Sequence, residues 1–96
     1  MDLEELLQEK KGEILEIASR YGAIDIRVFG SVARKSATKT SDIDLLVTLE
    51  PGRTLLDLGG LAYELEELLG RRVDVVTHHT LRKEVRDRVE REAIPL

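Results

Sequence analysis

The fold is decided by residues 29–47, which read FGSVARKSATKTSDIDLLV. Asp42 and Asp44 stand two residues apart at the start of an apolar run, so on a strand their side chains point to the same face. At a rise of about 3.3 Å per residue, their Cβ atoms lie roughly 6–7 Å apart. That span suits a divalent cation, or two cations about 3.5–4 Å apart. Because like charges on one face repel each other, we expect something positive between them.

The other half of this stretch is the Gly30-Ser31 pair. The preceding residues, 24–28, alternate apolar and polar side chains, which predicts a half-buried strand. Gly30 ends that strand, and Ser31 begins a short helical turn that reaches Arg34. Such a turn offers backbone N–H groups, a hydroxyl and a positive dipole end to a phosphate. A Gly-Ser pair alone is a weak signal, but its joint occurrence with the Asp pair, ten residues further on, is specific.

This pattern resembles the minimal nucleotidyltransferases, the smallest members of the DNA-polymerase-β-like nucleotidyltransferase superfamily. The residues that carry the resemblance are Gly30, Ser31, Arg34, Ser41, Asp42, Asp44 and the segment Val73-Asp74-Val75-Val76. The closing Arg91-Glu92-Ala93-Ile94 is similar to how these domains often end, so the resemblance covers nearly the whole chain. One position departs from the pattern: many relatives have Gly after the Ala-Arg pair, where this chain has Lys35. We expect Lys35 to change the backbone of the phosphate loop or to add a positive charge near the nucleotide.

The resemblance implies an enzyme that uses ATP and Mg²⁺. It assigns Asp42, Asp44 and Asp74 to a two-metal site, and Mg²⁺ prefers such oxygen ligands. A hydroxyl would attack the α-phosphorus and pyrophosphate would leave, with Asp74 accepting or orienting the hydroxyl proton. The nucleotide would be bound by Gly30, Ser31, Arg34 and Ser41; Ser31 would bind the β- or γ-phosphate. Arg34 would pair with a phosphate or with Asp42, or would be a solvated arginine.

The resemblance also implies a partner. Minimal nucleotidyltransferases of this kind act as antitoxins beside a HEPN-type RNase toxin and transfer AMP to a tyrosine of that toxin. The shortness of the chain favours an acceptor with its own surface, hence a protein. An aminoglycoside-type transfer to a small molecule is the rival within the class, although its larger relatives carry an extra helical domain. Two non-catalytic functions stay open: neutralising a partner by binding alone, and sensing ATP without turnover. Homo- and hetero-oligomers are both compatible with the sequence.

Length and composition narrow the alternatives. The 96 residues predict a single domain over 1–96. The chain has no cysteine, which excludes disulfides and thiolate metal sites and suits a reducing cytoplasm. No apolar run approaches the roughly 20 residues of a membrane span. A net charge of −4 and three aromatic residues argue against direct binding of nucleic acid.

Periodicity predicts an α/β fold with a small mixed sheet and helices packed against it. Helices are expected over 3–20, 54–69 and 81–93, and strands over 24–29, 43–49 and 73–77. The long crossover between the second and third strands favours a parallel pair, and the short connection between the first two favours an antiparallel pair. Asp42, Asp44 and Asp74 would then meet Gly30-Ser31 at one edge of the sheet.

Other conspicuous residues have plainer interpretations. His78-His79 is expected to be a polar turn rather than a metal site. Gly59-Gly60, inside a helical pattern, is expected to serve close packing or a kink. Asp25 and Arg27 are expected on the solvated face of their strand. The segment 35–40 is expected to be a loop.

Overall fold

A computed structural model describes residues 2–38 and 40–96 of the chain. Its elements are α1 (Leu3–Glu9), α2 (Lys11–Arg20), β1 (Ala23–Phe29), α3 (Gly30–Ala33), β2 (Ile43–Leu49), α4 (Leu55–Leu69), β3 (Val73–Val76), the 3₁₀ helix η1 (His78–Thr80), α5 (Lys83–Glu92) and β4 (Ile94–Pro95). The sheet has the order β3-β2-β1-β4. β2 is antiparallel to β1 and parallel to β3, and β4 is antiparallel to β1. The mixed sheet expected from the sequence is therefore confirmed.

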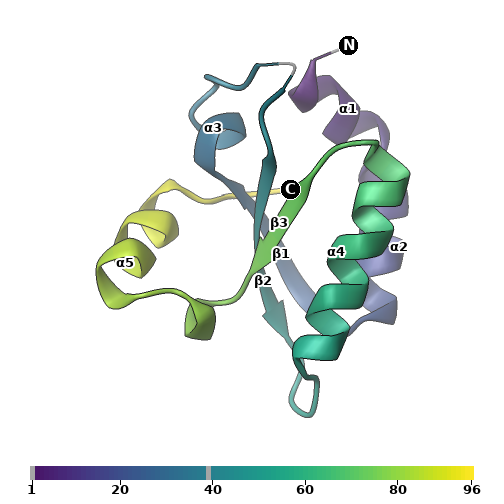
Figure 1. The fold of residues 1–96 in the computed structure, drawn as a ribbon, viewed down its shortest axis with the longest axis vertical. Helices are drawn as coiled ribbons and strands as arrows, with labels where there is room; N and C mark the ends of the chain where they lie inside the picture. The colour runs from purple at the N-terminus through teal and green to yellow at the C-terminus, as the bar shows by residue number, and fades with distance from the viewer. Residues whose placement is uncertain (1, 39) are drawn as a thin grey trace.

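The two faces of the sheet are covered differently. In Figure 1, α2 and α4 lie on one side of the sheet and α5 on the other. The main core forms on the first side, where Ile14 of α2 and Leu61 and Leu65 of α4 are fully buried with Ile43 and Leu45 of β2. Because strand side chains alternate, the buried Leu46 faces the second side, where α5 contributes the buried Val89. This two-sided burial explains why β2 reads as a continuous apolar run.

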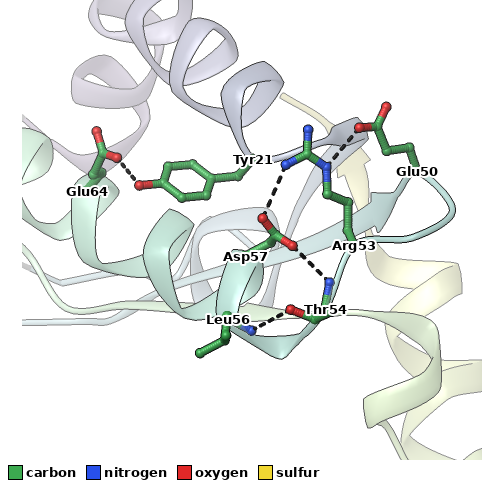
Figure 2. Close-up of polar contacts among 7 residues, drawn as sticks. All are labelled: Tyr21, Glu50, Arg53, Thr54, Leu56, Asp57 and Glu64. Atoms are coloured by element: carbon green, nitrogen blue, oxygen red, sulfur yellow. Dashed lines mark hydrogen bonds and ion pairs between the residues drawn. The ribbon is translucent and has the colours of Figure 1, made fainter.

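Side-chain caps begin two of the helices, α1 and α4. Asp2 accepts a hydrogen bond from Glu5 N at 2.8 Å and so begins α1. At the start of α4, Thr54 Oγ1 accepts from Leu56 N, and the Asp57 carboxylate accepts from Thr54 N at 2.9 Å. Figure 2 shows that Arg53 donates to Asp57 as well as to Glu50, which ties this cap to the turn after β2.

The expected helix over 3–20 is wrong in one respect, because it is two helices. Lys10 separates α1 from α2 with φ −95° and ψ 5°. The apolar stripe runs through Leu3 and Leu7 and resumes at Ile14, so a straight helix would bring Lys10 to the core-facing position between them. A lysine cannot be buried there without a partner, and the backbone breaks at that residue; its side chain lies 3.9 Å from Glu13.

The C-terminal part also differs from expectation. The predicted helix over 81–93 is shorter, because Leu81 and Arg82 are extended and α5 begins at Lys83. The two-residue strand β4, which pairs with Arg27 and Val28, was not predicted. The loop expected over 35–40 includes Lys39, which lies outside the described residues. Within the described part of the chain, no helix is long and apolar enough to cross a membrane.

Candidate active site

Three segments of the chain meet at the edge of the sheet where β1 ends and β2 and β3 begin. In the strand register Asp44 lies beside Phe29 on one side and beside Asp74 on the other. Gly30 directly follows Phe29, and Asp42 directly precedes β2. The convergence expected from the sequence is thus what the structure shows, because an antiparallel β1 and a parallel β3 deliver their opposite ends to one place.

Gly30 is in direct contact with the carboxylate of Asp44. Its φ of +71° is in the left-handed region, and an ideal Cβ built on it would overlap Asp44 Oδ2 and lie 3.0 Å from Cγ. A side chain at position 30 is therefore opposed both by backbone conformation and by space. The next residue, Ser31, lies in the single helical turn of α3, in which Gly30 O accepts from Arg34 N at 3.0 Å. The glycine lets this turn sit against the Asp44 carboxylate.

The Asp44 carboxyl is affected by its burial and by the other carboxylates at this edge. Partial burial raises the pKa of Asp44 above its usual value, and the negative charges of Asp74 and Asp42 raise it further. The positive charge of Arg34 opposes them. Asp42 is more open: its side chain is 49% exposed and lies 4.0 Å from Arg72 Nε. Among the charges that act on Asp44, Arg34 is the positive one, and the expectation that something positive lies between Asp42 and Asp44 stays a prediction.

These carboxylates fit a hard divalent cation better than any softer metal. Within the described residues, no three Asp, Glu or His side chains are already gathered closely enough to hold a metal ion. Mg²⁺ needs no such cage, because it commonly binds one or two carboxylates and fills the rest of its shell with water and substrate phosphates. Asp42 and Asp44, with Asp74 alongside, therefore suit a cation that arrives with a phosphorylated substrate.

Arg34 has a partner that the sequence did not suggest. Its Nη1 donates to Glu92 Oε1, so the expected pairing with Asp42 is not the one that the structure shows. Glu92 is the last residue of α5, and its side chain is only 16% exposed. Sequence reasoning did not single out Glu92; the one available signal was the similarity of Arg91-Glu92-Ala93-Ile94 to the usual ending of these domains.

Ser41 holds the loop that leads into β2. Its Oγ accepts a hydrogen bond from Thr38 N at 2.8 Å, and its own N–H donates to Thr38 O at 3.2 Å. The hydroxyl thus stabilises the approach to Asp42. Any nucleotide contact by Ser41 would use the remaining capacity of a hydroxyl already engaged in this turn.

Two expectations concern Lys35, a changed backbone of the phosphate loop or an added positive charge near the nucleotide, and the structure bears on both. Its φ is +60°, so a lysine here has the left-handed backbone that favours glycine. Its side chain lines a cavity of about 150 Å³ with Asp2, Leu3, Glu4 and Ala37. The loop therefore keeps a glycine-like backbone, and Lys35 contributes to the surface beside the acidic start of α1.

The remaining candidates lie outside this site. His78 Nδ1 is 2.7 Å from Glu90 Oε1, and both histidines belong to η1, consistent with a polar turn. Asp25 and Arg27 pair with each other at 3.0 Å on the exposed face of β1, as expected for a solvated face.

A mixed sheet with a Gly-Ser turn packed against paired strand-end carboxylates is the arrangement of a nucleotidyltransferase. Residues 11–96 match the nucleotidyltransferase domain family, and the chain belongs to that family. A Methanocaldococcus jannaschii chain assigned as a protein adenylyltransferase is 43% identical over 92% of this chain and 95% of its own length. The protein adenylyltransferase MntA of Thermococcus cleftensis is 39% identical over 97% of this chain and 91% of its own.

Solved structures agree with this assignment. One described as a minimal nucleotidyltransferase superposes with a TM-score of 0.87 at 52% identity, over 100% of this chain and 97% of that one. A toxin–antitoxin crystal structure with AMP-PNP shares the fold, with a TM-score of 0.76 at 21% identity over 88% of this chain and 70% of that one.

Proposed function

We propose that this chain transfers AMP from ATP to a protein hydroxyl, a tyrosine of a HEPN-type toxin, and so acts as the antitoxin of a toxin–antitoxin pair. The observation that carries the proposal is the meeting of Gly30, Asp44 and Asp74 at one sheet edge. Two comparisons support the acceptor class. The MntA relative is named a protein adenylyltransferase, and the fold is shared with a toxin–antitoxin complex.

In this proposal Asp42 and Asp44, with Asp74, hold Mg²⁺. When bound, Mg²⁺ neutralises the charge on the nucleotide's phosphates and on the leaving pyrophosphate. The protein's own contribution is placement: the strand register holds Asp44 between Phe29 and Asp74, and the Asp44 carboxylate lies against Gly30. The raised pKa of Asp44, caused first by partial burial and then by the charges of Asp74 and Asp42, supports this proposal, because a bound cation would offset the cost of ionising that carboxyl.

The nucleotide would lie on the Gly30-Ser31 turn. Gly30 allows the phosphates to approach the backbone, the Ser31 hydroxyl and N–H donate to the β- or γ-phosphate, and Arg34 supplies a guanidinium to the same phosphates. Ser41 borders the nucleotide from the loop before β2. These donors would neutralise a triphosphate, whose negative charge would otherwise be repelled by the aspartates.

Asp74 is the proton-handling residue in this proposal. It is exposed at the edge of the sheet, where an incoming hydroxyl can reach it. The hydroxyl oxygen forms a bond to the α-phosphorus while the bond between that phosphorus and the bridging oxygen breaks. Pyrophosphate takes the bonding electrons, and the hydroxyl proton passes to Asp74.

The experiment is an incubation with Mg²⁺, ATP labelled at the α-phosphate, and a purified HEPN-type toxin. We expect label on the toxin, loss of label when the acceptor tyrosine is changed to Phe, and no label with the Asp42→Asn, Asp44→Asn double variant. Asp25→Asn is the matched control, since it removes an exposed strand carboxylate that pairs only with Arg27 among the contacts described.

The same assay separates the alternatives. Unlabelled toxin that is still silenced by the double variant would mean neutralisation by binding alone, and would overturn the enzymatic proposal. Label found only on an added aminoglycoside would assign the chain to small-molecule transfer instead. Saturable ATP binding without pyrophosphate release would leave a nucleotide sensor.

A further inference from the structure

We infer that Glu92 is a positioning residue that holds Arg34 beside the nucleotide's phosphates and away from the aspartates. This inference rests on the proposed function, because it assigns a role within the same site. Arg34 and Glu92 are 58 residues apart in the sequence, and the Arg34 Nη1–Glu92 Oε1 contact joins the turn after β1 to the end of α5.

The two partners are unequally buried, and the more buried Glu92 is the one that holds the other in place. The Glu92 side chain is 16% exposed, whereas that of Arg34 is 57% exposed. The contact engages Nη1 of a guanidinium that carries five N–H donors in all. An arginine held on one side and open on the other can present its remaining donors to a phosphate.

The backbone around Glu92 is fixed from both directions. One turn earlier, Val89 is 2% exposed, and its carbonyl accepts from Ala93 N at 2.8 Å. Two residues later, Ile94 pairs with Val28 of β1, the strand that leads into the Gly30-Ser31 turn. The short strand β4 therefore ties the position of Glu92 to the same strand that positions the phosphate turn.

Electrostatics give the pairing a function beyond stability. The Arg34 guanidinium and the Glu92 carboxylate carry opposite charges and are in direct contact. An unheld Arg34 would be drawn to the Asp42 and Asp44 carboxylates, where it would occupy the place of the cation. Glu92 supplies a competing carboxylate, and an arginine already held in place loses less rotamer freedom when the nucleotide binds.

The test measures the Kd of a non-hydrolysable ATP analogue, with Mg²⁺, by titration calorimetry. Glu92→Gln keeps the shape and an acceptor oxygen but removes the charge, and we expect Kd to rise about 10-fold, as for other supporting residues. In the transfer assay KM for ATP should rise similarly, with kcat changed much less, because the lost interaction serves binding. The matched control is Glu90→Gln, on the same helix and paired with His78, for which Kd should stay unchanged.

A double variant distinguishes positioning from a merely structural effect. If Glu92 acts through Arg34, then Glu92→Gln should change Kd by less than about twofold when Arg34 is already Gln. An undiminished effect in the Arg34→Gln background, or an unchanged Kd in Glu92→Gln alone, would overturn the inference and leave the proposed function standing. Wild-type protein that binds no nucleotide at all would overturn both. Circular dichroism melting of each variant checks that the fold is retained.

Discussion

A Cβ atom on Gly30 would overlap the Oδ2 atom of Asp44. These two residues belong to different halves of the sequence pattern: Gly30 directly follows β1, and Asp44 is the second residue of β2. The fold brings them into contact. The glycine has a positive φ as well. The turn that would receive phosphates and the carboxylate that would bind their cation are thus set relative to each other by a contact that tolerates no side chain.

Gly30→Ala should therefore impair activity more than its effect on stability would suggest. We expect the variant to lose about 1–3 kcal/mol of unfolding free energy from its strained φ and about 10²-fold in AMP transfer from the displaced carboxylate. Urea denaturation and the labelled-ATP assay measure the two effects.

Gly52→Ala is the matched control for this prediction. Gly52 also has a positive φ, +91°, but nothing lies within 4 Å of its added Cβ, and it belongs to the turn after β2. It should lose stability without losing transfer activity. Equal activity losses in the two variants would show that the Gly30–Asp44 contact has no special part in the reaction.

Asp44→Asn should raise the stability of the ligand-free protein while removing activity. Because the folded state raises the pKa of Asp44, it binds this proton more tightly than the unfolded chain does. Stability contributed by the neutral form is therefore lost as the pH rises from the ordinary carboxyl pKa through the raised one. We expect the variant to gain about 0.5–1 kcal/mol at pH 7, roughly 2–8 °C in Tm, and to lose at least about 10³-fold in activity.

Melting curves between pH 3.5 and 7 test this sign directly. The difference in Tm between variant and wild type should grow as the pH rises through that window. Mg²⁺ with an ATP analogue should raise the Tm of the wild type and leave that of Asp44→Asn nearly unchanged. A wild type more stable than the variant at pH 7 without ligand would contradict the electrostatic account.

The two adjacent glycines of α4 should respond to alanine in opposite ways. Gly59 has nothing within 4 Å of its added Cβ, so Gly59→Ala should gain about 0.5–1 kcal/mol from helix propensity. A Cβ on Gly60 would lie 2.5 Å from Cε1 of Tyr21, whose hydroxyl donates to Glu64 (Figure 2). Gly60→Ala should therefore lose about 1–3 kcal/mol from overpacking. Paired urea denaturation curves compare the variants, and destabilisation by both would mean that Gly59 also serves packing.

Lys35 should respond to substitution through its backbone rather than its charge. A non-glycine residue in the left-handed conformation destabilises the fold by roughly 1–2 kcal/mol. Glycine removes this strain but loses more chain entropy on folding, which offsets about 0.5–1 kcal/mol of the gain. Lys35→Gly should thus be more stable than Lys35→Ala, which removes the same charge but keeps the strained φ. Both variants should transfer AMP at the wild-type rate. A loss of transfer shared by both would instead place the Lys35 charge at the nucleotide.

The sequence pattern predicted the sheet and the place where its segments meet, because both follow from side-chain periodicity and connection length. Residues 43–49 form a continuous apolar run because both faces of their strand are buried, and a crossover of more than twenty residues to Val73 favours a parallel neighbour. The break at Lys10 escaped prediction because the apolar stripe has the same helical phase before and after it. Only the lysine at a core-facing position of the stripe marks the interruption.

Two other features depended on tertiary structure. β4 is two residues long and contains Pro95, so it has neither the length nor the alternation that identify a strand. Glu92 belongs to a helix in which charged residues are abundant, and the sequence does not show which of them turns inward. Its pairing with Arg34 depends on β4, which places the end of α5 beside the Gly30-Ser31 turn.

Parallel incubations with ATP labelled at the α- or the γ-phosphate test whether this sheet edge transfers AMP. With Mg²⁺ and a HEPN-type toxin, we expect label to be retained on the toxin from the α-position alone. Retention should disappear in the Asp42→Asn, Asp44→Asn variant and persist in Asp25→Asn. Label retained from the γ-position, or equal retention by the double variant, would show that this edge does not transfer AMP.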